Sequence, residues 1–406
     1  MYKKNCFVKI GLKRTLVLLV LINLILTFSI PIFNQNYARA EHKKQNKKIL
    51  YVGGTRAGNY SKIQTALENA SNGYEIFVYN GTYTENLIIE KSVILNGESK
   101  NTTIIEGKRK DNVIEIKSSS VKISNFTIKN SGKKNAGILI CSENNVIKNN
   151  EILENNYGIQ IKNGTNNHIK YNAITSNLES AIQLEESKNN SVYFNKICYN
   201  CLNSTNFTFK PGLSLKNSTE NVVYENFFLL NQIGLLLFNS NQNSFFNNYL
   251  KDEKIGVRMI NSSKNNISNN IFEENRVGTY LYESKNNIIE RNCIQNSLRG
   301  IYIEESKSNT ITKNHLTKNI KGIFSSYATS NVIAYNNLIS NDVNAEFIRY
   351  LHTGYIKPNR WKRNYYDTWP GIGFKIIPGA IVIIPEEIFL KWFNLDLNPA
   401  EEPYDI

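Results

Sequence analysis

The sequence repeats itself about every 22 residues through its central part, and this repeat limits the fold more than any other feature. One spacing is stretched to 31 residues by an insertion at about 201–211. A period of this length is typical of solenoids, in which each repeat packs mainly against its two neighbours. The repeats begin, in order, at Gly137, Gly158, Ala181, Gly212, Gly234, Gly256, Gly278, Gly300 and Gly322.

Two positions of the repeat are always asparagine. Asparagine tolerates left-handed backbone conformations at corners, and identical side chains stacked at strand spacing can bond to one another as a ladder. We therefore interpret both columns as structural corners. The tenth position reads Asn167, Asn190, Asn221, Asn243, Asn265, Asn287, Asn309 and Asn331, and the fifteenth reads Asn172, Asn195, Asn226, Asn248, Asn270, Asn292, Asn314 and Asn336.

Short segments of alternating polarity lie between these corners. Alternation over three to five residues is the pattern of a half-buried strand, so each repeat predicts one coil of three short strands, stacked in parallel on the next coil. We predict one interior column formed by Ile169, Val192, Val223, Phe245, Ile267, Ile289, Ile311 and Ile333.

The pattern GIxIxxSxNNxIxxNxIxxN, which residues 300–319 follow closely, resembles the right-handed parallel β-helix repeat. That repeat is shared by NosD-like proteins and by pectin-lyase-like carbohydrate-binding and sugar-hydrolase proteins. Residues 61–98 are similar to the opening of such proteins, and 364–369 with 398–405 are similar to their ending. The resemblance implies an all-β, single-stranded right-handed parallel β-helix and leaves the activity open.

This interpretation divides the chain into four parts. Residues 1–40 are a signal peptide or an uncleaved N-terminal anchor, because a basic stretch precedes a long apolar segment at 15–33 and Ala38-Arg39-Ala40 offers a cleavage site. Residues 41–75 are a linker and a capping helix with a capping box at Ser61 and Gln64. The β-helix spans 76–343, and 344–406 cap its other end. We expect an exported protein, in the periplasm, at the cell surface or outside the cell.

Cysteine usage gives a weaker signal. Cys198 and Cys201 form a CxxC motif without a second motif nearby, so a local disulfide between them is a better interpretation than a metal site. Two inert thiols are the alternative. We expect no metal ligand set and no cofactor.

One outward side of the last full coils changes from amides to aromatic residues. Arg258, Tyr280, Tyr302 and Phe324 occupy the third position of successive repeats. Aromatic rings stack on sugars and arginine binds carboxylates, so we predict a ligand-binding face here; a purely structural stacking ladder is the alternative. If the protein is an enzyme, Glu283 and Glu305 are its candidate catalytic residues, because stacked strands about 4.8 Å apart place them near the separation of a retaining glycosidase pair.

Three functions fit these features. The first is an exported β-helix protein that binds polysaccharide, acidic glycans included, or acts as a surface scaffold; the net charge of +14 agrees with an acidic partner. The second is a polysaccharide lyase or glycosidase, with calcium as a possible cofactor of a lyase. The third is the copper-processing role that the NosD resemblance implies, against which the scattered histidines and cysteines argue. We expect a monomer without a nucleic-acid partner, and membrane contact only through an uncleaved N-terminus.

Overall fold

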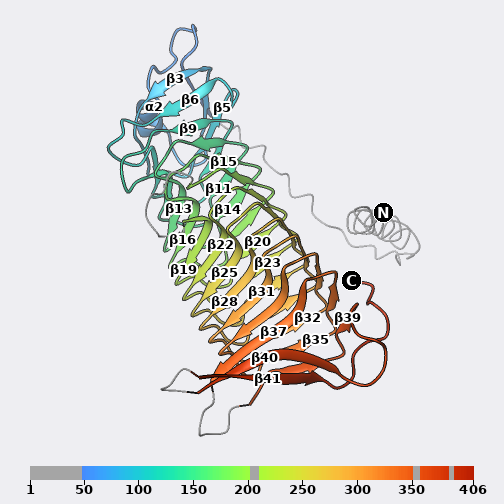
Figure 1. Cartoon of the computed structure of the whole chain (residues 1–406). Helices are drawn as coiled ribbons and strands as arrows, with labels where there is room; N and C mark the ends of the chain where they lie inside the picture. The colour runs from blue at the N-terminus through green and yellow to red at the C-terminus, as the bar shows by residue number, and fades with distance from the viewer. Residues whose placement is uncertain (1–47, 202–209, 351–356, 384–387) are drawn as a thin grey trace, which may run out of the picture. The chain divides into compact units, whose positions relative to one another are not determined.

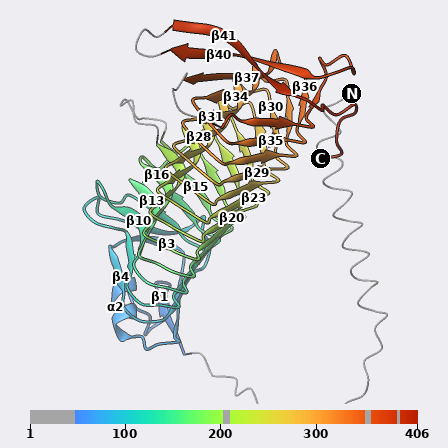
Figure 2. The same cartoon turned by 90° about the horizontal axis from the view of Figure 1, so that it is seen from below.

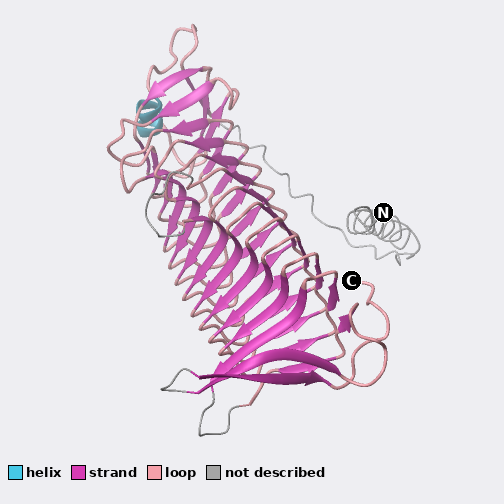
Figure 3. Ribbon diagram, in the orientation of Figure 1, coloured by secondary structure: helices cyan, strands magenta, loops and turns pink. Residues whose placement is uncertain are grey.

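The protein is a β-solenoid of about 22 residues per coil, as the repeat predicts. The computed structural model describes residues 48–201, 210–350, 357–383 and 388–406. Figures 1 and 3 show that stacked strands dominate this part of the chain and that helix is scarce. The strands form three parallel ladders, which we call the first, second and third faces. The expectation of an all-β parallel solenoid is confirmed.

The first face begins at the N-terminal end and carries the interior column. Its strands are β1 (Ile49–Val52), β2 (Glu75–Val78), β5 (Ile94–Gly97), β8 (Lys122–Ser124), β11 (Val146–Lys148), β14 (His168–Lys170), β17 (Ser191–Tyr193), β20 (Val222–Tyr224), β23 (Ser244–Phe246), β26 (Asn266–Ser268), β29 (Ile288–Glu290), β32 (Thr310–Thr312), β35 (Val332–Ala334) and β38 (Arg360–Lys362).

The second face has the longest strands of the repeat. Its strands are β4 (Leu87–Ile89), β7 (Ile114–Ile116), β10 (Ala136–Ile140), β13 (Tyr157–Lys162), β16 (Ser180–Glu185), β19 (Pro211–Lys216), β22 (Ile233–Phe238), β25 (Ile255–Ile260), β28 (Val277–Tyr282), β31 (Arg299–Glu304), β34 (Lys321–Ser326), β37 (Val343–Tyr350) and β40 (Lys375–Ile383), followed by the antiparallel β41 (Ile388–Asp396).

The third face is a separate 13-stranded sheet. Its strands are β3 (Gly81–Thr84), β6 (Thr103–Glu106), β9 (Thr127–Lys129), β12 (Glu151–Leu153), β15 (Ala173–Thr175), β18 (Lys196–Cys198), β21 (Phe227–Leu229), β24 (Tyr249–Lys251), β27 (Ile271–Glu273), β30 (Cys293–Gln295), β33 (His315–Thr317), β36 (Asn337–Ile339) and β39 (Tyr365–Tyr366).

The interior is an apolar stack flanked by asparagine ladders. All eight residues of the predicted interior column are buried, and each pairs with the next across successive strands of the first face. In the tenth-position column each Asn Nδ2 donates to Oδ1 of the next at 2.9–3.2 Å, and in the fifteenth-position column at 3.0–3.1 Å. Both predicted ladders are confirmed.

The left-handed residues of the corners are not the ladder asparagines. Positive φ angles occur one residue earlier, for example at Asn166 (φ 55°) before Asn167 and at Tyr171 (φ 56°) before Asn172. The preceding residue makes the turn, and the ladder asparagine follows it with its side chain directed inward. The prediction that the ladder asparagines themselves adopt the left-handed conformation is wrong by one position.

The N-terminal end is covered by α2 (Ile63–Asn69), which buries Ile63, Ala66 and Leu67. Its N-cap is Lys62, which makes no side-chain capping bond, so the capping box predicted at Ser61 and Gln64 is wrong. The Glu85 carboxylate accepts from the backbone N–H groups of Ile63 at 2.9 Å and Gln64 at 3.0 Å. A side chain from the adjoining coil therefore satisfies the free N–H groups of this helix.

Parallel pairing reaches beyond 76–343 at both ends, from β1 with β2 to β35 with β38 and β36 with β39. At the C-terminal end Asp396 accepts from the backbone N–H and the Nδ2 of Asn364, both at 3.0 Å, and so ends the fifteenth-position ladder. Among the described residues no helix is long and apolar enough to cross a bilayer. The predicted signal or anchor at 1–40 lies outside the described residues.

Candidate ligand-binding face

Two tyrosines form the centre of the predicted face. Tyr280 of β28 and Tyr302 of β31 pair across the second face, and their rings stack with centroids 4.6 Å apart and planes 6° apart. Phe324 of β34 continues the stack at 5.2 Å and 26°. We call these three residues the aromatic ladder. The strand register places one ring on each coil, as the repeat predicts.

An apolar strip supports the ladder from one side. Ile233, Ile255 and Val277 begin β22, β25 and β28 and are buried, and Tyr280 and Tyr302 pack against them. Because this strip lies outside the main interior, the rings rest on a small core of their own. Such packing fixes the rings before any ligand arrives, which lowers the entropic cost of binding.

Glu304 is the acidic partner of the ladder, and the sequence analysis missed it. The Tyr280 hydroxyl donates to the Glu304 carboxylate. Burial, and then this carboxylate, raise the pKa of Tyr302 to about 12, and the same causes raise the pKa of Tyr280. Both phenols therefore keep their protons at neutral pH. Glu304 stands two residues after Tyr302, on the same side of the strand, so reading the fifth repeat position together with the third could have found it.

Two guanidinium groups lie over the rings. The Arg258 Cζ is 5.3 Å from the centroid of Tyr280, and the Arg299 Cζ is 4.7 Å from that of Tyr302. Neither arginine has a carboxylate within ion-pair distance in the described part of the chain, and the Arg258 Nε is buried without a hydrogen-bond partner. Cation–π contact holds both groups in place while their N–H donors remain available for an acceptor.

The far end of the ladder is less accessible than we predicted. Phe324 is only 6% exposed. The Arg299 guanidinium lies 5.1 Å and the Lys321 Nζ 4.7 Å from its ring centroid, and Lys321 also pairs with Glu346 of β37. Phe324 therefore ends the stack as a supporting ring, and the accessible part of the ladder is the half-buried pair Tyr280 and Tyr302.

Glu283 and Glu305, the candidate catalytic pair, lie beside the ladder strands and not in them. Each directly follows its strand, at a corner with a φ of 47°, and both side chains are exposed. The acid in contact with the ladder is Glu304. Glu283 and Glu305 are therefore exposed corner residues and do not form a buried acid–base pair.

Cys198 and Cys201 are both buried and free, so the predicted disulfide is not formed in the structure. Cys198 ends β18, whereas Cys201 follows the ladder corner at Asn200 and directs its thiol to the Glu179 carbonyl oxygen at 3.2 Å. The corner separates the two side chains. Burial raises the pKa of each thiol to about 12, which keeps both protonated at neutral pH.

Comparison with known proteins gives the family. The family model described as "Periplasmic copper-binding protein (NosD)" matches residues 67–259 and 250–368, together more than half of the chain. The chain belongs to the NosD family. No curated protein matches this NosD-family sequence.

Solved structures similar to this NosD-family protein share the solenoid. An alginate lyase in complex with a trisaccharide aligns with a TM-score of 0.62 at 11% identity, covering 87% of this chain and 92% of that one. The A-module of the Azotobacter vinelandii mannuronan C-5 epimerase AlgE4 aligns at 0.55 and 15% identity, covering 73% and 92%. The Dettilon tailspike protein aligns at 0.59 and 18%, covering 72% and 67%. At these identities the likeness concerns the fold alone.

The copper named by the family does not fit the described side chains. No three His, Cys, Asp or Glu side chains lie together there. Cys293 and His315, partners across β30 and β33, are a pair of suitable donors, but they are only two and Cys293 is 7% exposed. Met259 is fully buried in the interior. Copper needs a converging set of soft or imidazole ligands, which these residues do not provide.

Proposed function

We propose that this NosD-family protein binds an acidic polysaccharide along the aromatic ladder of β28 and β31. The observation that carries the proposal is the pair of guanidinium groups of Arg258 and Arg299. Both lie over the stacked tyrosines, and neither has a carboxylate partner among the residues that the structure describes. Guanidinium groups bind carboxylates in a two-pronged geometry. The stacked tyrosines present their ring edges to a sugar, because their faces are occupied by each other, by Arg258 and by Phe324. Together these groups match a sugar that carries a carboxylate.

The arrangement of the face favours a chain-like ligand. The rings recur once per coil along the solenoid, with Arg258 on β25 and Arg299 on β31 beside them, so successive sugars can meet successive coils. Arg276, exposed directly before β28, adds a further positive charge on this side. Charge complementarity of this kind increases the association rate and the specificity for an anionic polymer.

The chemistry of two structural neighbours agrees with this ligand class. Their names link them to alginate and to mannuronan, which are chains of uronic acids. The likeness to them supports a solenoid that can accommodate an extended acidic sugar chain, while the assignment of the ligand rests on the arginines and tyrosines. We further propose that the protein is exported, because the family is described as periplasmic and residues 1–40 have the pattern of a signal or anchor.

The test is a binding screen of the purified protein on acidic and neutral polysaccharides, with the double variant Tyr280→Ala and Tyr302→Ala beside it. We expect the wild type to bind acidic chains and the variant to bind them with at least tenfold lower affinity. We also expect the variant to stay folded, because the apolar strip remains. Circular dichroism and the melting temperature monitor the fold.

The matched control is Tyr193→Ala with Tyr224→Ala, a stacked pair on the first face with centroids 4.8 Å apart and planes 5° apart. The control should bind like the wild type. Binding that survives in the ladder variant, or that only the control abolishes, would refute the proposed site. New reducing or unsaturated sugar ends in the wild-type reaction would assign the enzymatic alternative in place of simple binding.

A further inference from the structure

The two ends of the solenoid are finished differently. At the N-terminal end, the turn after β1 folds back on itself: the Gly53 N–H donates to the Tyr60 carbonyl at 2.8 Å, and the Asn59 Nδ2 donates to the Gly53 carbonyl at 2.6 Å. Together with α2, this turn covers the first coil. At the C-terminal end, the last strand of the second face is β41, which lies beyond β37 and β40 (Figure 2).

Within the described part of the chain, one edge of β41 has no strand beside it over most of its length. Its other edge pairs with β40 in antiparallel register along all nine residues. On the free edge, the only described strand that β41 meets is β38, at the single pair Trp361 and Asp396. Residues 388–395 thus present backbone N–H and C=O groups along a straight edge, which is a ready template for another strand.

The side chains of this edge strand are apolar on both of its faces. Ile388, Leu390 and Trp392 point to one face and Phe389 and Phe393 to the other, and each is between 46% and 60% exposed. Lys391 is the sole charged residue in 388–395. Natural edge strands are commonly protected by several charges, a proline or a bulge, and none of these protects this one.

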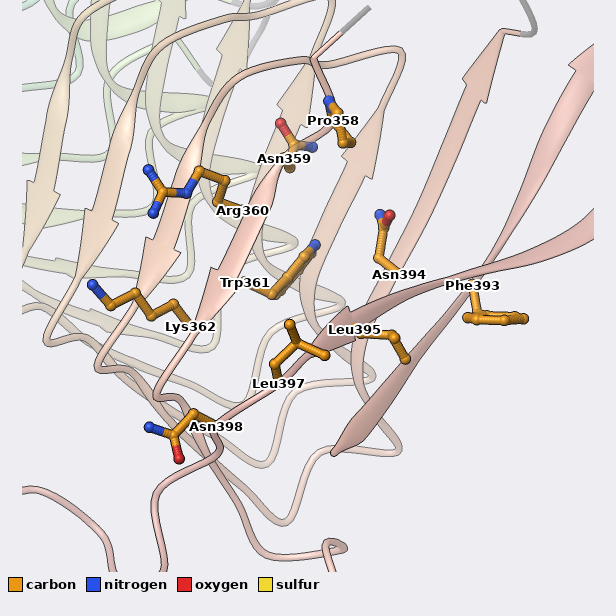
Figure 4. A pocket seen from close by; sticks show the side chains of 10 residues that line it. All are labelled: Pro358, Asn359, Arg360, Trp361, Lys362, Phe393, Asn394, Leu395, Leu397 and Asn398. Carbon is orange, nitrogen blue, oxygen red and sulfur yellow. The ribbon is translucent and has the colours of Figure 1, made fainter. Parts of the chain in front are cut away.

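A hollow continues the apolar surface where β41 leaves β38. It has a volume of about 510 Å³ and is lined by Trp361, Leu395 and Leu397 among others (Figure 4). Leu397 is 73% exposed. Arg360 and Lys362 also line the hollow, and their side chains extend away from Trp361 (Figure 4).

We propose that β41 pairs with β41 of a second copy of this chain, in antiparallel register, and so joins two solenoids by their C-terminal ends. A second strand satisfies the free backbone groups, whereas a lipid surface would leave them without partners. Pairing about Trp392 sets Lys391 opposite Phe393 of the second copy, so no like charges face each other. Because a two-fold contact uses the same edge of both copies, the association closes at two copies and does not grow into a fibre. This dimer replaces the monomer that we expected from the sequence.

The experiment is sedimentation velocity of the full chain over a range of concentrations, with the variants Trp392→Glu and Trp392→Lys. We expect the wild type to sediment as a particle with twice the mass of one chain, which is 46.5 kDa. Each variant alone should be a monomer, because like charges would meet on the two-fold axis. An equimolar mixture of the two variants should restore the dimer, since opposite charges then face each other.

The matched control is Leu178→Glu, which changes a side chain of similar exposure, 51% against 48% for Trp392, at a corner in the middle of the solenoid. This control should remain a dimer. A monomeric wild type at every concentration, a dimer that persists in both Trp392 variants, or a mixture that stays monomeric would each overturn the proposal. The proposal would also be overturned if the protein is a monomer that co-floats with vesicles of anionic phospholipid and if Trp392→Glu abolishes this co-flotation. The edge would then contact lipid.

Discussion

At the scale of single residues, asparagine makes the fold because its side chain serves two neighbouring coils at once. Asn270, for example, accepts from the backbone N–H of Asn248 at 2.9 Å and donates to the Phe245 carbonyl at 3.0 Å and to Asn292 Oδ1 at 3.0 Å. The sequence was sufficient to predict these ladders. The sequence was not sufficient to distinguish the ladder asparagines from the left-handed residues before them, because asparagine occurs at both of these corner positions.

Replacement of Asn270 by Ala should lower the melting temperature markedly. The change leaves the buried Asn248 N–H and the buried Phe245 carbonyl without partners, at a cost of about 1–3 kcal/mol each. The matched control is Asn269→Gly, an exposed neighbour with a φ of 54° that glycine adopts readily. Thermal denaturation followed by circular dichroism compares the two. Equal melting temperatures for both variants would contradict the role that we give to the ladder.

Glu253 is the acid in a ladder column that otherwise contains asparagines and Ser297. It is buried and accepts from Asn231 Nδ2 at 2.9 Å, and no described residue forms a hydrogen bond with its Oε2. Burial raises the pKa of this carboxyl well above its ordinary value of 4.5. The folded protein therefore holds a proton there that the unfolded chain releases, and stability falls as the pH rises from about 4.5 through the raised pKa.

The variant Glu253→Asn should remove this part of the pH dependence. We expect a higher melting temperature than the wild type at pH 7, and a difference between the two proteins that narrows toward pH 4. The measurement is the melting temperature of both proteins from pH 4 to 8. A difference that is constant over this range would mean that Glu253 does not titrate as described.

At the scale of the strand, alternation decides which side chains point outward from the solenoid. It was sufficient to place Tyr280 and Tyr302 side by side and outward. It failed for Phe324, because Arg299 and Lys321 cover that ring, and long side chains from other repeat positions are not visible in a single column. Glu304 was missed for the same reason: its contact with Tyr280 joins the fifth position of one coil to the third position of its neighbour.

A pair of substitutions in β29 tests which of its side chains point into the solenoid. Ile289→Asp places a charge in the interior column and should cost several kcal/mol of stability, since an unpaired carboxylate would be buried there. Ile288→Asp makes the same change one residue earlier, where the side chain is 42% exposed, and should have little effect. Chemical denaturation of both variants gives the comparison. Similar losses of stability would contradict the register of the first face.

At the scale of the molecule, the repeat predicts the body of the solenoid better than its ends. The coils from β10 to β36 follow the 22-residue pattern, whereas the ends use contacts that have no repeat. Glu85 caps α2 from the adjoining coil, and β41 pairs with β40 in antiparallel register, unlike the parallel pairs of the coils. Such contacts depend on which segments meet in space, and a local pattern does not contain this information.

If two copies join through β41, one dimer carries two aromatic ladders, and a long polysaccharide would gain affinity from binding both.

The most direct test of the proposed function is titration calorimetry with one acidic polysaccharide in two forms, the free acid and the fully methyl-esterified chain. Esterification removes the carboxylate charges and retains the sugar rings, so it isolates the contribution of the guanidinium groups. We predict that the wild type binds the free acid at least tenfold more tightly than the ester, and that Arg258→Ala with Arg299→Ala abolishes this preference while Arg276→Ala retains most of it. Equal affinity of the wild type for both forms, or an unchanged preference in the double arginine variant, would contradict the account.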